Sequence, residues 1–90
     1  MIKSFGSKET EKILKGIRST NIPFEIQQIG RRKLRMINNS VTIIDLRISP
    51  SNRLEKREDY HSIRINDQLG IIFKWQNGHS FEVEIIDHHK

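Results

Sequence analysis

The sequence contains no cysteine. Disulfide bonds, thiolate metal sites and cysteine nucleophiles are therefore excluded, and such a composition suits a reducing compartment. Long apolar runs are also absent, so we expect no membrane span. The segment Met1–Gly6 lacks the apolar stretch of a secretory signal. Together these absences predict a cytoplasmic protein.

Motifs that mark common enzyme chemistries are missing as well. The sequence has no glycine-rich phosphate loop, no zinc-ligand spacing and no Gly-x-Ser-x-Gly nucleophile turn. It therefore predicts neither a cofactor nor a metal ion.

Charge is plentiful and unevenly distributed. The 90 residues, of which 34% are hydrophobic and 30% charged, predict one folded domain over residues 1–90. Residues 1–45 hold nine basic and four acidic residues, whereas residues 46–90 hold seven of each, so the net charge of +5 comes from the first half. A concentrated basic region can attract RNA, but a solvated surface explains it equally well.

The first half has the pattern of helices. Ser7 is a plausible N-cap, acidic residues follow it and basic residues precede Gly16, which predicts a helix over residues 8–15. Pro23 suits the first turn of a second helix. That helix has one buried stripe, formed by Ile26, Gly30, Leu34 and Ile37.

Two features of the second helix concern its neighbours. Gly30 lies on the buried stripe, which predicts close approach by another element. Arg31, Arg32 and Arg35 lie away from the stripe, with Lys33 to one side. This side of the helix is expected to be basic.

The second half alternates with the period of strands. Residues 62–66, 69–75 and 81–86 form three alternating segments separated by turn residues, which predicts an antiparallel meander. Residues 2–5 are a further short strand candidate. One sheet face is apolar and is expected to pack on the helices, while the other stays open. The predicted class is α+β, with N-terminal helices packed on one face of a twisted antiparallel sheet.

Facing side chains suggest the strand register. A three-residue loop over residues 77–79 places Ile71 opposite Ile85 and Lys74 opposite Glu82, whereas a two-residue turn would mix apolar and charged groups. We therefore predict the longer loop. The same logic places Ile63 opposite Phe73 and Asn66 opposite Gly70.

The open face carries side chains suited to phosphodiester chemistry. Arg64, Asn66 and His88 are expected at the same end of it. RNA cleavage without a metal needs a base for the 2′-hydroxyl proton, a cation for the phosphorane and an acid for the leaving oxygen. The alternative is that Arg64 and Glu84 form only a solvated surface ion pair.

The tail is dense in titratable groups and leaves three interpretations open. Asp87, His88 and His89 could supply general acid and base, bind a metal together with His79, or form a terminus without a role. Metal binding is the weakest, because adjacent strand histidines point to opposite faces and no third ligand has a recognisable spacing.

Six blocks of sequence carry a family resemblance, and they cover nearly the whole chain in family order. They are residues 1–5, 32–37, 45–47 followed by Pro50, 52–55, 62–68 and 83–89. With these blocks the sequence resembles HigB-family toxins.

The resemblance implies a RelE-like microbial RNase fold and metal-free cleavage of mRNA in the decoding site of the 70S ribosome. It also implies inhibition by a helix-turn-helix antitoxin of the HigA type in the bacterial cytoplasm. Toxin and antitoxin would repress their operon together, so that operator DNA is contacted only through the antitoxin.

The resemblance also implies residue roles. The family's Asp-Tyr-His tail maps to Asp87, His88 and His89, with His88 at the usual tyrosine position, and Arg64 completes the catalytic set. It also carries over Arg53 and Asn66 as RNA contacts. The chain's own basic residues add further expected RNA contacts, which are Lys56 and Arg57 in the short connection and Arg31, Arg32 and Arg35 on the basic helix.

Two departures from the family pattern motivate an alternative. Leu69 and Gly70 replace the usual Trp-Arg, and the connection over residues 55–60 is short, although it keeps Lys56 and Arg57. The chain is thus expected to be an active mRNA endonuclease or, alternatively, a weakened toxin that mainly binds antitoxin and represses the operon. A third hypothesis is a basic RNA-binding domain without an antitoxin.

Overall fold

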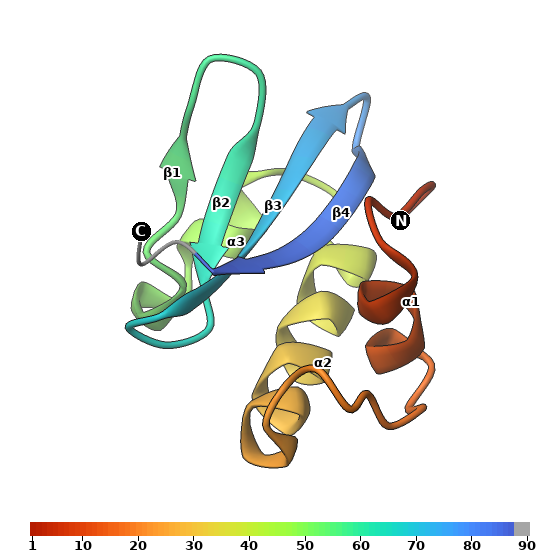
Figure 1. The fold of residues 1–90 in the computed structure, drawn as a ribbon. Coiled ribbons are helices and arrows are strands. Elements are labelled where there is room, and N and C mark those ends of the chain that lie inside the picture. Colours follow the sequence, from red (N-terminus) through yellow and green to blue (C-terminus); the bar gives the residue numbers. More distant parts are fainter. Residues whose placement is uncertain (88–90) are drawn as a thin grey trace.

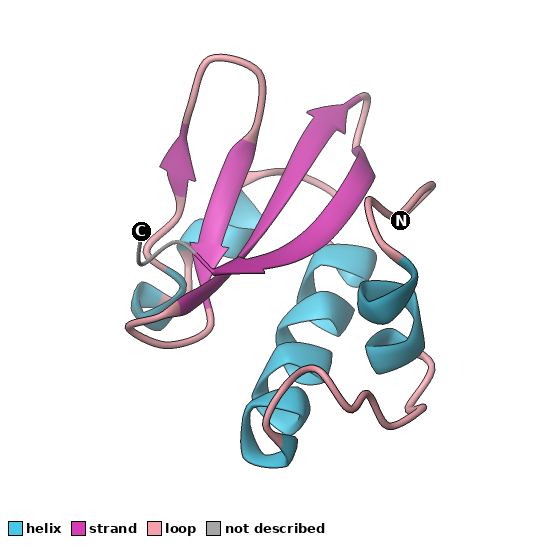
Figure 2. Cartoon of the chain, in the orientation of Figure 1, coloured by secondary structure: helices cyan, strands magenta, loops and turns pink. Residues whose placement is uncertain are grey.

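The computed structural model describes residues 1–87, and within them the helices precede the sheet (Figures 1 and 2). The α+β fold class is confirmed. None of the helices in this part of the chain is long and apolar enough to cross a membrane. The elements are α1 (Lys8–Leu14), α2 (Phe24–Asn39), α3 (Ile44–Arg47), the 3-10 helix η1 (Pro50–Asn52), β1 (Glu55–Lys56), β2 (His61–Arg64), β3 (Leu69–Gln76) and β4 (His79–Asp87).

Local sequence explains where the helices begin and end. Ser7 caps α1, because its Oγ accepts a hydrogen bond from the backbone N–H of Thr10 at 3.2 Å. Gly16 follows α1 with a φ of +80°, a conformation that favours glycine. Pro23 stands immediately before α2. A side-chain cap thus begins α1 as predicted, whereas α2 has no side-chain cap and begins one residue after Pro23.

The sheet has the strand order β1-β2-β3-β4 and every neighbouring pair is antiparallel. Helices α1 and α2 lie together beside one face of it (Figure 1). The predicted close approach at Gly30 is confirmed, because a Cβ there would lie 3.5 Å from Cδ1 of Ile65. The core between the layers consists of Ile13, Leu34, Ile37, Leu46, Ile63, Ile65, Ile71, Phe73 and Val83.

The N-terminal segment extends the sheet beyond β4. Ile2 forms a parallel bridge with Ser80, and Phe5 forms one with Val83. The predicted strand over residues 2–5 is therefore present as two isolated bridges.

The turn between β3 and β4 differs from the prediction. Gln76 pairs with His79, which leaves a two-residue turn rather than a three-residue loop. Asn77 and Gly78 have φ values of 53° and 79°. This left-handed pair matches the twist of an antiparallel hairpin, and asparagine followed by glycine adopts it readily.

A β-bulge reconciles the short turn with the apolar pattern. The register shifts between Ile72 and Lys74, where Glu82 has a φ of 52°. One extra residue on β4 moves the following side chains back to the correct face. Ile71 therefore pairs with Ile85 as predicted. Lys74 pairs in the register with Phe81 rather than with Glu82 as predicted, but it forms an ion pair with Glu82 at 2.9 Å, which raises the pKa of Lys74.

The predicted register of β2 on β3 is wrong by two residues. Ile63 pairs with Ile71, rather than with Phe73, and Arg64 pairs with Gly70, the place expected for Asn66. A shift by two preserves the face of every side chain, because strands alternate with period two. Hydrophobic alternation alone therefore could not distinguish the two registers.

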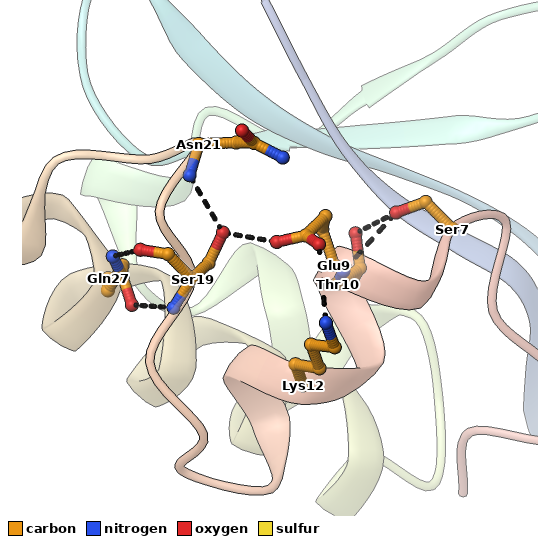
Figure 3. A network of polar contacts seen from close by, with 7 residues as sticks. All are labelled: Ser7, Glu9, Thr10, Lys12, Ser19, Asn21 and Gln27. Carbon is orange, nitrogen blue, oxygen red and sulfur yellow. Dashed lines mark hydrogen bonds and ion pairs between the residues drawn. The ribbon is translucent and has the colours of Figure 1, made fainter.

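The loop between α1 and α2 is fastened by a polar network (Figure 3). The backbone N–H of Ser19 donates to Oε1 of Gln27 at 3.0 Å, and Nε2 of Gln27 donates back to the carbonyl of Ser19 at 2.7 Å. The Ser19 hydroxyl donates to Glu9, which lowers the pKa of that carboxyl, with a smaller contribution from Lys12. These bonds fix the loop against both helices.

Candidate functional site

The open face of the sheet contains a hollow of about 220 Å³. A cross-strand row of Arg64, Gly70 and Ile86 crosses it, and Gly70 contributes no side chain to this row. The lining residues are Glu55, Arg57, Tyr60, Ser62, Ile63, Arg64, Gly70, Ile71, Ile72 and Ile86. We call this the open-face hollow.

Arg64 lies in the hollow without a carboxylate partner among residues 1–87. Its side chain is half-buried at the end of β2. Glu84 does not pair with it, and instead its Oε1 lies 2.8 Å from the position that a Cβ on Gly6 would take. The interpretation of Arg64 and Glu84 as a surface ion pair is therefore wrong, and within residues 1–87 no carboxylate competes with an anion for this guanidinium.

Lys33 supports this arginine from the other side of the sheet. It is only 4% exposed, and its Nζ donates to the backbone carbonyls of Arg64 at 2.7 Å and Ser51 at 3.4 Å. Burial lowers the pKa of Lys33, and the charge of Arg32 lowers it further. Lys33 is thus not part of an exposed basic face, but ties α2 to the end of β2.

The hollow also contains two residues, Glu55 and Tyr60, that the sequence pattern did not predict as site residues. Strand β1 was not predicted, because two residues are too short to show alternation. It pairs Glu55 with Ser62 and so brings Glu55 to the open face. Tyr60 reaches the hollow because its carbonyl accepts a hydrogen bond from the Arg57 N–H at 2.7 Å, which closes the hairpin.

The two basic residues of this hairpin differ in position. Arg57 lines the hollow and forms an ion pair with Glu55 at 3.5 Å. Lys56 is exposed, pairs with His61 in the register and does not line the hollow.

Asn66 is engaged in a turn rather than in the hollow. Its Oδ1 accepts hydrogen bonds from the backbone N–H groups of Gln68 at 2.9 Å and Leu69 at 2.6 Å. This arrangement shapes the turn between β2 and β3. The structure therefore separates the amide of Asn66 from the lining of the hollow.

Most of the other predicted RNA contacts lie elsewhere. Arg53 follows η1 with a φ of 45° and is exposed outside the hollow. Arg32 and Arg35 are exposed on α2, in the helix layer behind the sheet. Arg31 is half-buried, with its Cζ 3.2 Å from the position of a Cβ on Gly16. The structure does not bring these residues together with Arg64.

The C-terminal predictions are only partly within the described residues. Asp87 ends β4, pairs with Leu69 and accepts a hydrogen bond from Nε2 of Gln68 at 3.1 Å. His88 and His89 lie outside the described residues. Within residues 1–87 there is no group of three or more side chains that could hold a metal ion.

Helices packed on one face of a four-stranded antiparallel sheet are consistent with a RelE-like fold. Comparisons with known proteins agree with this fold. The model of a family described as the RelE-like toxin of type II toxin–antitoxin system HigB matches residues 3–89. The chain belongs to this family. A type II system pairs its toxin with an antitoxin, so the family implies an antitoxin partner.

Two curated proteins are similar to a large part of this chain. Toxin HigB-1 of Vibrio cholerae serotype O1 is 37% identical over 73 residues, which cover 77% of this chain and 76% of that protein. An uncharacterized protein of Haemophilus influenzae is 42% identical over 62 residues, which cover 64% of this chain and 61% of that protein. The chain thus spans less than two thirds of the second relative.

Proposed function

We propose that the protein is a ribosome-dependent mRNA endonuclease that holds the scissile phosphate in the open-face hollow. The observation that carries the proposal is the half-buried guanidinium of Arg64, which has no carboxylate partner among residues 1–87 and lies in a hollow with Arg57. A guanidinium in such a place stabilises a phosphate and, more strongly, a phosphorane.

The proposed reaction uses side chains as acid and base. A base takes the proton of the 2′-hydroxyl, whose oxygen attacks the adjacent phosphorus, and the bond from phosphorus to the 5′-oxygen breaks as an acid protonates that oxygen. The products are a 2′,3′-cyclic phosphate and a 5′-hydroxyl. In this proposal His88 and His89 exchange the protons, Asp87 orients them and Arg64 stabilises the phosphorane.

The described part of the hollow adds a second candidate for the base. Glu55 is a carboxylate that lines the hollow, and Tyr60 lines it as well. A carboxylate can accept the 2′-hydroxyl proton, and the neighbouring Arg57 orients it.

The proposed partners are those that membership of the family suggests. They are the 70S ribosome with its mRNA, an antitoxin of the HigA type with a helix-turn-helix domain, and operator DNA bound only through that antitoxin. The proposed location is the bacterial cytoplasm. Arg53, Lys56, Arg32 and Arg35 are exposed, and we propose that they contact ribosomal RNA outside the hollow.

The test is to induce the chain in bacteria and map the 5′ ends of mRNA, with and without the neighbouring antitoxin gene. We expect growth arrest and new 5′-hydroxyl ends within translated regions, both suppressed by the antitoxin. Normal growth and intact mRNA in cells that contain folded protein would contradict the proposal.

One observation favours the alternative, a weakened toxin that mainly binds antitoxin and represses the operon. Gly70 stands between Arg64 and Ile86 in the central row and provides no cation. Losing one charge-stabilising group lowers a rate by roughly a hundredfold. The test is Gly70→Arg, for which the alternative predicts a gain of mRNA cleavage, whereas an active wild-type hollow predicts no gain.

A further inference from the structure

A second cleft lies between the end of α1 and the start of α2, in the helix layer. Its volume is about 160 Å³. Ile17, Arg18, Phe24 and Arg31 belong to its walls, and none of the described residues that line it is a carboxylate. We call it the helix cleft.

Two apolar side chains that line the helix cleft are exposed to solvent. Ile17 is 52% exposed and Phe24 is 53% exposed. Ile17 directly follows Gly16, where α1 has ended, and Phe24 begins α2, so the two side chains come from opposite sides of the loop. Exposed apolar groups that border a concave surface are typical of an interaction site.

The positive charge of the helix cleft lacks compensation. Arg18 and Arg31 form no ion pair among residues 1–87. Within the same residues, the buried Nε of Arg31 has no hydrogen-bond acceptor. A buried N–H without an acceptor is rare in proteins, so one beside an open cleft can donate to a partner's oxygen without breaking an existing hydrogen bond.

The loop that presents these groups is already ordered. Ser19 and Gln27 hold it by reciprocal hydrogen bonds, and Ser19 also binds Glu9 on α1 (Figure 3). A partner therefore does not have to order the loop when it binds, which removes one entropic cost of association.

The chemistry of the cleft favours a protein segment over RNA. The guanidinium of Arg18 lies 5.2 Å from the centroid of the Phe24 ring and covers one face of it. A base could stack on that face only by displacing the arginine. Ile13 and Ile17 give the cleft an aliphatic wall, which suits an apolar side chain better than a phosphate.

We propose that the helix cleft docks the cognate antitoxin. The antitoxin segment places an apolar side chain between Ile17 and Phe24, and a carboxylate on Arg18 and Arg31. The proposal rests on the family's implied antitoxin partner, on the exposed apolar side chains of the cleft and on its arginines, which form no ion pair among residues 1–87. It is independent of RNA cleavage in the open-face hollow.

The experiment titrates the purified antitoxin encoded next to the toxin gene into the full-length toxin by calorimetry. The double variant Ile17→Ser, Phe24→Ser is expected to weaken binding by roughly a hundredfold, since central apolar anchors dominate interfaces. Arg18→Glu is expected to weaken it by roughly tenfold and Arg18→Lys much less. Wild-type affinity in the double variant would overturn the proposal.

The matched control is the double variant Val41→Ser, Ile48→Ser, which removes aliphatic groups that are 74% and 75% exposed near α3. Its affinity should stay within about threefold of wild type. A larger loss there than in the cleft variant would place the antitoxin on α3 and overturn the proposal. Thermal unfolding of all variants verifies that they are folded.

Two further outcomes identify other occupants. A toxin dimer in sedimentation that the cleft variant abolishes would assign the cleft to a second copy of the chain. Loss of mRNA cleavage with unchanged antitoxin affinity would assign it to RNA. Either result overturns the proposal. The calorimetry and the sedimentation do not depend on whether the open-face hollow cleaves RNA, because neither measurement contains RNA.

Discussion

The open-face hollow and the helix cleft each present an arginine that has no carboxylate partner among residues 1–87, but their walls differ. The open-face hollow contains a carboxylate, a phenol and a hydroxyl, from Glu55, Tyr60 and Ser62. The helix cleft has aliphatic and aromatic walls with Ile13, Ile17 and Phe24. Polar groups around a guanidinium suit a reacting phosphate, whereas apolar groups around one suit a docked peptide segment.

The two sites also lie on different layers of the fold. One opens on the uncovered face of the sheet, and the other opens between the helices that cover the opposite face. A small domain can therefore separate two binding chemistries by placing them on opposite sides of one core. We expect substitutions in one site to leave the activity of the other site intact.

The largest expected effect is on cleavage. Arg64→Gln should lower the rate of mRNA cleavage on programmed ribosomes by roughly a hundredfold, because it removes the cation from the hollow. Antitoxin affinity should stay unchanged. The control is Arg47→Gln, which removes an exposed arginine of α3 outside the hollow. Equal rates for the two variants would remove Arg64 from the site.

The next effect is on stability. Lys33→Met should lower the free energy of unfolding by about 2 kcal/mol, measured by urea denaturation, because two partly buried carbonyls lose their donor. Arg32→Met is the adjacent, exposed control and should change stability little. If the Lys33 variant is as stable as the control, the tie between α2 and β2 has no structural role.

A smaller expected effect on the cleavage rate tests whether Glu55 or a histidine of the C-terminal tail is the catalytic base. Glu55→Gln should slow cleavage by roughly tenfold if this carboxylate accepts the 2′-hydroxyl proton. The control Glu58→Gln changes an exposed carboxylate of the same hairpin that does not line the hollow. An unchanged rate in the Glu55 variant would leave proton transfer to His88 and His89.

The smallest expected effect is a pH dependence of the free energy of unfolding. It arises from His61, which lines neither site. His61 stacks on Phe73 with ring centroids 5.9 Å apart, and burial, aided by the charge of Lys56, lowers its pKa below 6.5. As pH falls below about 6.5, the unfolded chain binds this proton before the folded chain does, so the free energy of unfolding decreases. Stability curves from pH 7 to 5 should be flatter for His61→Phe, and identical slopes would contradict this assignment.

Much of the fold was predictable, because alternation and capping act locally. Ser7, the α2 stripe and the inward strand residues have the positions that their spacing predicts. The register was not predictable in the same way. The bulge at Glu82 and the two-residue shift of β2 both leave the pattern of buried faces unchanged, so that pattern carries no information about them.

The candidate site was predictable only in part. Arg64 follows from strand alternation, and it does line the hollow. Glu55 comes from an edge strand too short for any period, and the burial of Lys33 depends on two distant carbonyls. Asn66 looked like a ligand-binding amide because a turn-forming amide has the same sequence signal.

The most direct test replaces Tyr60, in the open-face hollow, or Ile17, in the helix cleft, with the photoreactive residue benzoylphenylalanine. Each toxin is irradiated on ribosomes programmed with labelled mRNA and, separately, with purified antitoxin. We expect position 60 to crosslink to mRNA and position 17 to crosslink to antitoxin. A crosslink from position 17 to mRNA, with none from position 60, would show that the two sites have been assigned wrongly.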